Sequence, residues 1–531
     1  MCIIKMGGFQ MKKKKSLFAR IKNIFSDVKQ NPDPLKSAIM SFFIMGLGQL
    51  RNKQRSKAAV FFSVLLVFLL AELLTGNYQY AMDEISRFPA DAGTPLYFFR
   101  DYGGMISKGL WGLFTLGKVP GQILYRGQFV ETFNKTIPWL TADNSVTLLG
   151  TGLIALILSG IFLSFWLMNV RDAYISRKAH LRGEKIETGL VYVRRLWSDM
   201  FPYIVLIPAL IMILFFTLIP FLFSFLLAFT NYTYRIPIPN QLIKWVGFDT
   251  FKLIVADAGW FKIFSQVLGW TFVYAIMASA TCYILGMIQA IIIESRYVKV
   301  KKLWRTILIV PWAVPAMISL MVFRNVFETN GLANQLLYMT GTMNGVSSFL
   351  YGIGLQGALD NPIFWFSAVY NGNLAKVVVI LVNLWLGAPY FMMLITGVLT
   401  TLPKDLYEAA SIDGASKWQS FKNITLPLIL KATVPAIVMT FTFNFNNFGA
   451  IFFLTGGGPR WDDALIPMSM KLSGGIPGQT DILISWIYNL SFANNAQLYN
   501  VAAVYSILIF AFVGFISVYN LSRSKGLWEE D

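Results

Sequence analysis

The stretch that decides how this chain folds and works is Glu408-Ala409-Ala410-Ser411-Ile412-Asp413-Gly414, which is followed by Ile424-Thr425-Leu426-Pro427. It lies between two long apolar segments. Lipid cannot account for a polar, tightly patterned stretch between membrane spans, because polar side chains in hydrocarbon are costly. We therefore expect these residues to contact another protein at the membrane face.

The composition is that of a multi-span membrane protein. Of the 531 residues, 56% are hydrophobic and only 14% are charged, and ordinary soluble domains do not reach these values. The net charge of +18 comes from short basic loops between apolar runs, which is typical of cytoplasmic loops and not of nucleic-acid binding. Cys2 and Cys282 are the only cysteines and have no histidine or thiol nearby, so we expect neither a disulfide nor a metal site.

Apolar runs of about 20 residues predict an all-α, polytopic membrane protein with about eight transmembrane helices. We place these spans at about 57–75, 147–169, 201–229, 262–292, 304–323, 375–399, 432–454 and 501–521. The run at about 37–49 is too short to cross, and we interpret it as a re-entrant or interfacial piece.

Basic residues crowd the loops 171–195 and 296–305, so the positive-inside rule places both loops, both termini and the Glu-Ala-Ala segment in the cytoplasm. The segments 76–146, 230–260, 324–374 and 455–500 then lie outside. We expect four regions: a cytoplasmic N-terminal segment, a transmembrane pair with the external loop 76–146, a transmembrane core that contains the segment 402–427, and a cytoplasmic tail. Their bounds are 1–56, 57–200, 201–522 and 523–531.

Local signals predict two short helices in the segment 402–427. Asp405 to Ile412 can form one helix, and Asp413-Gly414 supplies a turn in which glycine takes a positive φ. Ser416, three residues before Gln419, is a capping-box signal for the second helix. An ordinary loop between spans is the alternative that local physics leaves open.

The pattern Glu408-Ala409-Ala410, Gly414, Ile424 and Leu426-Pro427 resembles the Glu-Ala-Ala signature of binding-protein-dependent ABC importer permeases, whose two short helices dock into a cleft on the ATPase subunit. The context of Asn383 to Tyr390, and Thr455-Gly456-Gly457-Gly458-Pro459, looks like the larger, eight-span type of maltose/maltodextrin permease subunit. Good resemblance covers about 200–522. The enteric subunit, however, carries a large external domain that the segment 230–260 is too short to hold.

The resemblance implies a type I importer permease core that couples to its ATPase through Glu408, Ala409, Ala410, Asp413 and Gly414. It implies a second homologous permease, two ATPase subunits, an extracellular solute-binding protein and an oligosaccharide substrate, in a plasma membrane. The chain has no Gly-x-x-x-x-Gly-Lys-Ser/Thr motif, so we expect it to be a transporter subunit and not an enzyme, with ATP and Mg²⁺ on the ATPase chains.

Two predicted spans each have a face that carries polar residues: Asn383, Leu386, Gly387 and Tyr390 share one face of the sixth, and Thr440, Asn444 and Asn447 share one face of the seventh. Buried amides need partners, which a hydroxyl-rich ligand would supply, and aromatic rings can cover a pyranose. Chemistry alone fits contacts between helices equally well. The resemblance places a sugar site here, formed by Asn383, Leu386, Gly387, Tyr390, Phe391, Thr440, Asn444 and Asn447.

The alternative function is a self-contained secondary carrier or channel, in which the two cytoplasmic helices would be connectors only. The importer interpretation requires a partner, because two ATPases need two Glu-Ala-Ala segments and this chain has one. The polar face recognises hydroxyl groups generically, so it fits maltose, longer maltodextrins, galacto-oligosaccharides and other glycosides alike.

Overall fold

The computed structural model describes residues 32–76, 78, 103–117, 128–130, 135–137, 144–184, 189–233, 236, 242–295, 297–357, 359, 361–367, 372–461, 466, 470–471, 475–492 and 497–528. Contacts divide the chain into two compact units. The first comprises residues 1–224 and 236–245, and the second comprises residues 225–235 and 246–531.

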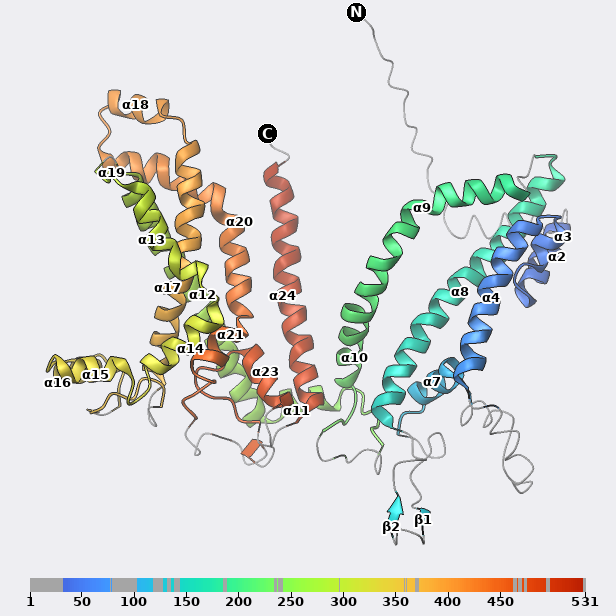
Figure 1. The fold of residues 1–531 in the computed structure, drawn as a ribbon, viewed down its shortest axis with the longest axis horizontal. Helices are drawn as coiled ribbons and strands as arrows, with labels where there is room; N and C mark the ends of the chain where they lie inside the picture. Colours follow the sequence, from blue (N-terminus) through green and yellow to red (C-terminus); the bar gives the residue numbers. More distant parts are fainter. Residues whose placement is uncertain are drawn as a thin grey trace, which may run out of the picture. The chain divides into compact units, whose positions relative to one another are not determined.

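The first unit consists of helices and one small hairpin (Figure 1). Its elements are α2 (Asp33–Phe43), α3 (Leu47–Arg51), α4 (Arg55–Thr75), α7 (Met105–Phe114), the antiparallel strands β1 (Gln128–Val130) and β2 (Lys135–Ile137), α8 (Ser145–Leu181), α9 (Gly189–Ile213), the π-helical turn η2 (Leu214–Leu218), and α10 (Ile219–Leu227), which ends in the second unit. α7 lies very close to α8, because a Cβ at Gly152 would stand 2.6 Å from the carbonyl oxygen of Gly109.

The second unit is a helical bundle. Its elements are α11 (Asp249–Ala256), α12 (Ala258–Glu294), α13 (Lys301–Ala313), α14 (Ala316–Val326), α15 (Leu332–Met339), α16 (Met343–Gly352), α17 (Asn373–Thr401), α18 (Asp405–Ile412), α19 (Lys417–Ser420), the π-helical turn η3 (Phe421–Thr425), α20 (Leu426–Phe445), α21 (Phe448–Leu454), α23 (Leu483–Phe492) and α24 (Tyr499–Trp528).

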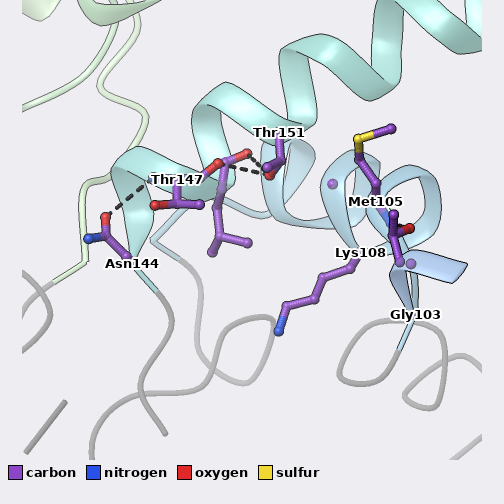
Figure 2. Close-up of a pocket in the computed structure, with 10 residues that line it drawn as sticks. Gly103, Met105, Lys108, Asn144, Thr147 and Thr151 are labelled. Atoms are coloured by element: carbon purple, nitrogen blue, oxygen red, sulfur yellow. Dashed lines mark hydrogen bonds between the residues drawn. The ribbon is translucent and has the colours of Figure 1, made fainter. Parts of the chain in front are cut away.

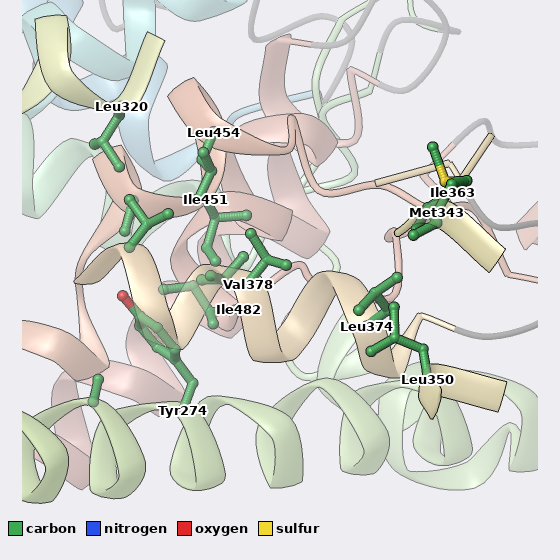
Figure 3. Packing of buried hydrophobic residues seen from close by; sticks show 14 residues of the cluster. Tyr274, Leu320, Met343, Leu350, Ile363, Leu374, Val378, Ile451, Leu454 and Ile482 are labelled. Atoms are coloured by element: carbon green, nitrogen blue, oxygen red, sulfur yellow. The ribbon is translucent and has the colours of Figure 1, made fainter. Parts of the chain in front are cut away.

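The core of this bundle forms where α12 and α17 pack side by side. Tyr274 of α12 and Val378 of α17 belong to one buried apolar cluster, which Ile451 of α21 also joins (Figure 3). Within the second unit, Figure 1 shows α18 and α19 at one end of the bundle and α15 and α16 at the other. The long helices therefore separate two ends that can have different partners.

Apolar helices of spanning length confirm the predicted polytopic, all-α class, with β1 and β2 as a minor exception. Among the described residues six helices qualify, and a bent pair would make a seventh. They are 55–75, 145–181, 191–227, 258–294, 373–401 and 417–445, with the bent pair 301–313 and 316–326. Neither α2 nor α3 is among them, in agreement with a segment that does not cross.

Two predicted spans need correction, and the one at about 501–521 stays a prediction, because the apolar helix found there among the described residues, Tyr499–Phe515, is shorter than a span. The span at about 304–323 is not one straight helix, because α13 and α14 meet at an angle of 85°. Val314 is extended there and Pro315 has no N–H to continue the helix. The span at about 432–454 was placed too late: α20 ends at Phe445, and α21 is a separate helix capped by Asn447.

Candidate functional site

The Glu-Ala-Ala segment forms a helix and a tight turn, as predicted. α18 ends at Ile412, and Gly414 follows with a φ of +73°. The N–H of Asp413 donates to the carbonyl of Ala409 at 3.0 Å, and the N–H of Ala415 donates to that of Ala410 at 2.9 Å. No atom lies within 4 Å of a Cβ built on Gly414. The backbone conformation, and not a shortage of space, therefore requires glycine here.

The second helix begins at the predicted capping box. The side chain of Ser416 accepts from the N–H of Gln419 at 3.3 Å, and the side chain of Gln419 accepts from the N–H of Ser416 at 2.7 Å. α19 then continues through η3 into α20, so this helix runs directly into a membrane-spanning segment. The hydroxyls of Tyr407 and Thr425 are 2.9 Å apart and tie α18 to the foot of that span.

The surface of these two helices is open. Ala410 is buried, whereas Glu408, Ala409, Asp413 and Gly414 are exposed. Ile412 is 86% exposed and Trp418 is 69% exposed, which leaves two large apolar side chains without cover on a polar segment. Sequence reasoning did not select Ile412 or Trp418, although large apolar residues in a short polar loop are a usable signal. Docking of an ATPase onto this surface stays a prediction.

Asn383 and Gly387 of the predicted sugar face lie against α12. The hydroxyl of Tyr274 donates to Oδ1 of Asn383 at 3.4 Å, and Nδ2 of Asn383 lies 3.7 Å from Sγ of Cys282. A Cβ on Gly387 would stand 2.7 Å from the same sulfur. In this conformation both residues serve the crossing of α12 and α17, and their contact with sugar stays a prediction.

The polar residues predicted on one face of α20 share it only in part, because Thr440 and Asn444 lie on this helix and Asn447 does not. Asn444 is buried and donates from Nδ2 to Oγ of Ser279 at 3.0 Å, which again is a contact with α12. Asn447 lies beyond the end of the helix, where its side chain accepts from the N–H of Ala450 at 3.2 Å and caps α21. Thr440 is half-buried on α20. The shared face is wrong for Asn447, because the helix on which it was counted stops at Phe445.

The remaining predicted residues differ in how open they are. Phe391 is fully buried, with its ring edge-on to that of Tyr283 at 5.2 Å between centroids. Tyr390 is 36% exposed, and its ring centroid lies 6.4 Å from that of Trp312, which is 57% exposed. Leu386 lines a cavity of about 290 Å³ together with residues 311–316 at the break between α13 and α14. Trp312 was missed because the span that carries it was predicted to be continuous.

A buried carboxylate lies in the segment after α21. Asp481 accepts from the N–H of Gly478 at 2.7 Å, from Oγ of Ser485 at 2.6 Å and from Nδ2 of Asn489 at 3.3 Å. Burial raises the pKa of the Asp481 carboxyl to about 6, because its charged form is desolvated. A Cβ on Gly457 would stand 2.5 Å from this carboxylate, so the glycine cluster is folded tightly around it.

A cavity of about 390 Å³ lies in the first unit, between the start of α7 and the start of α8 (Figure 2). Its polar side chains are those of Lys108, Asn144 and three threonines, and the hydroxyl of Thr151 donates to the carbonyl of Thr147. None of the predicted site residues lines this cavity. The predicted sugar face and this cavity thus belong to different units.

Comparisons with known proteins agree on the class of protein to which this chain is similar. Residues 282–526 match the family described as "Binding-protein-dependent transport system inner membrane component". The chain is 35% identical over 494 residues to the galactooligosaccharides transport system permease protein GanP of Bacillus subtilis, covering 93% of this chain and 98% of that protein. It is 32% identical over 504 residues to the maltodextrin transport system permease protein MalC of Streptococcus pneumoniae, covering 94% and 98%.

The maltose/maltodextrin transport system permease protein MalF of Klebsiella aerogenes matches over a shorter stretch. It is 36% identical over 281 residues, which cover 53% of this chain and 49% of that protein. Similarity to the first two relatives therefore extends well beyond the residues 200–522 that carry the resemblance in the sequence, whereas similarity to the enteric relative is confined to about half of each chain.

Proposed function

The chain belongs to the family of binding-protein-dependent transport system inner membrane components, and from this premise we propose that it forms half of the pathway of an ATP-driven oligosaccharide importer. As a permease of this family it is a multi-pass subunit of the plasma membrane and not an enzyme. The names of its relatives support a maltodextrin-like or galactooligosaccharide-like substrate.

The observation that carries this proposal is the pair formed by α18 and α19. Two short helices, joined by a turn at Gly414, stand at one end of the bundle and leave Ile412 and Trp418 uncovered. The pair leads without interruption into the span 417–445. A push on this surface would therefore be transmitted directly to α20, which is what coupling to an ATPase requires.

We assign the partners by the chemistry that each step needs. Two ATPase subunits hold ATP and Mg²⁺, and one of them docks on this chain while the other docks on the second permease. The contact on this chain comprises the exposed residues Glu408, Ala409, Asp413 and Gly414, with Ala410 buried beneath them. A second homologous permease completes the pathway, and an extracellular solute-binding protein delivers the sugar. The basic loops support a cytoplasmic location for both termini and for α18.

Sugar binding then requires a rearrangement of the polar contacts between α12, α17 and α20. In the described conformation Asn383 and Asn444 bond to α12, and Tyr390 is partly open. We propose that closure of the ATPase dimer tilts α20 and α17, so that sugar hydroxyls replace these helix contacts. The sugar site would comprise Asn383, Leu386, Gly387, Tyr390, Phe391, Thr440, Asn444 and Asn447, and Trp312 would adjoin it next to Tyr390.

The test compares two glycines that have similar backbone conformations and open surroundings but lie at different positions in the fold. Gly414 and Gly341 both have positive φ, of +73° and +68°, and neither has an atom within 4 Å of a built Cβ. Valine strains either turn equally, but only Gly414 adjoins the coupling surface. In complex purified with all partners, Gly414→Val and Glu408→Lys should lose ATPase subunits or sugar-stimulated hydrolysis, and Gly341→Val should keep both. Full ATPase content with normal stimulated hydrolysis in both coupling variants would remove the proposal.

A further inference from the structure

The polarity of helix α2 is the reverse of that expected for a helix exposed to water. Its buried residues are small or polar, namely Pro34, Ser37, Ala38 and Ser41. Its large apolar side chains lie on the outer side: Phe43 is 77% exposed, and Ile39, Phe42 and the adjoining Ile44 are also exposed, although the Phe42 ring contacts that of Trp166 on α8. A helix in water buries its apolar face and exposes its polar one. The arrangement fits a helix whose outer face meets hydrocarbon.

Polar bonds hold α2 against α8 at the turn where α2 ends. The N–H of Gly46 donates to Oδ1 of Asn169 at 3.0 Å, and Nδ2 of Asn169 donates to the carbonyl of Ser41 at 2.9 Å. Asn169 is fully buried, and its own carbonyl accepts from Nε2 of Gln49 at 2.9 Å. One asparagine thus satisfies backbone groups on both sides of the turn, as non-helical backbone at membrane depth requires.

The position of α2 along α8 defines how deep it reaches. At its start, Asp33 pairs with Arg177 at 2.5 Å. At its end, Nε1 of Trp166 donates to the carbonyl of Phe42 at 2.9 Å. Arg177 and Trp166 are eleven positions apart on α8, a rise of about 16 Å at 1.5 Å per residue. Phe42 therefore lies level with the apolar part of a membrane-spanning helix.

The neighbouring surface is also of the kind that faces lipid. Leu163, Leu167 and Met168 are exposed on the same stretch of α8, so the apolar surface of α2 continues that of an established span. At the opposite end, Lys36 and Arg55 are exposed and would lie at the level of the lipid phosphates. The hydrophobic tip and the cationic base have the order of acyl chains and head groups in one leaflet.

We propose that residues 33–51, the α2–α3 wedge, are inserted into one leaflet of the bilayer and that acyl chains cover Phe42, Phe43 and Ile44. The wedge enters and leaves on the side of the basic loops, and Asn169 holds its tip at depth. Its partner is lipid with anionic head groups, and neither a second copy of the chain nor another subunit covers it.

Spin labels on the full-length chain test this proposal in vesicles of phosphatidylethanolamine and phosphatidylglycerol. In a background with Cys2→Ser and Cys282→Ser, one nitroxide is attached through Phe43→Cys. Leu163→Cys serves as the lipid-facing control, and Lys36→Cys serves as the head-group control on the same helix. The label at 43 should relax more with oxygen than with a water-soluble nickel chelate, as at 163, and the label at 36 should show the reverse.

Each other outcome overturns the proposal in a distinguishable way. High nickel accessibility at 43 would place the tip in water. Low accessibility to both reagents would mean that protein covers it, and dipolar broadening between labels would identify that protein as a second copy. Since lipid accessibility is read without transport activity, the result is independent of the proposed importer function.

The role of Asn169 has a matched control on the same helix. Ser164 is exposed and bonds only its own helix, at the carbonyl of Gly160. Asn169→Leu leaves the backbone groups of the turn without partners, and should lower the oxygen-to-nickel accessibility ratio at position 43 toward that at position 36. Ser164→Leu should leave the ratio unchanged. An unchanged ratio in Asn169→Leu would overturn the assignment of Asn169 as the residue that holds the tip at depth.

Discussion

Replacing the two partly open aromatic residues should weaken sugar uptake to different degrees. Tyr390 and Trp312 lie at the break between α13 and α14, with ring centroids 6.4 Å apart. Burying a large side chain fully is worth about 1.5–3 kcal/mol. Only the exposed part can be covered by sugar, which is 36% of Tyr390 and 57% of Trp312.

Scaled by these fractions, Tyr390→Ala should lose about 0.5–1 kcal/mol of sugar binding and Trp312→Ala about 1–2 kcal/mol. These losses correspond to roughly twofold to fivefold and roughly fivefold to thirtyfold weaker apparent affinity. Neither replacement leaves a fully buried cavity, so assembly should persist. Tyr390→Phe keeps the ring and isolates the hydroxyl.

The assay is uptake of radiolabelled maltodextrin or galactooligosaccharide into proteoliposomes that contain the assembled importer, at limiting sugar concentration. Basal ATP hydrolysis and subunit content serve as controls for coupling and assembly. Equal, wild-type apparent affinities in Tyr390→Ala and Trp312→Ala would refute the reasoning, and a larger loss in the tyrosine variant would refute the scaling by exposure.

Three further predictions concern buried contacts. Asn444→Ala and Ser279→Ala break the same hydrogen bond and should lower the unfolding temperature alike. If the Asn444 amide binds sugar, only Asn444→Ala should also lower the uptake affinity, by roughly tenfold. Equal uptake in both variants would make Asn444 a helix contact alone. Gly286→Ala places a Cβ 2.7 Å from the carbonyl oxygen of Ala388 and should cost about 1–3 kcal/mol of stability, whereas Gly269→Ala, in open space on the same helix, should cost nothing; similar unfolding temperatures for both would contradict the close crossing. Asp481 has a folded-state pKa raised from 3.8 to about 6, so the folded state binds the proton more tightly. This contribution of about 3 kcal/mol to stability is present below about pH 4 and is lost as the pH rises through about 6. Asp481→Asn should remove that pH dependence from the unfolding midpoint, and an unaltered dependence would show that the carboxylate is not its source.

The coupling segment could be predicted from sequence because its signals are local. Gly414 has the positive φ that the Asp-Gly turn predicts, and Ser416 and Gln419 form the predicted capping box. Neither depends on distant residues. The tie between Tyr407 and Thr425 could not be foreseen, because it depends on how α18 folds back on the foot of α20.

The sugar face was harder to predict because hydropathy does not reveal where a helix ends. A break at Asn446 separates Asn447 from Asn444, although both lie in an apolar run. In the same way, Pro315 bends a run that reads as one span and brings Trp312 beside Tyr390. The partners of Asn383 and Asn444 all come from α12, which sequence spacing within one helix cannot indicate.

The bend at Pro315 also limits which side of the second unit can face lipid in the membrane. In a helix the carbonyl of Pro311 would accept from the N–H four residues later, and Pro315 has none to give. A carbonyl oxygen without a donor in hydrocarbon costs several kcal/mol, so contact between lipid and this bend is unfavourable. The bend must therefore be wetted or covered by protein. The missing N–H of Pro315 therefore requires the bend to face away from the surrounding lipid.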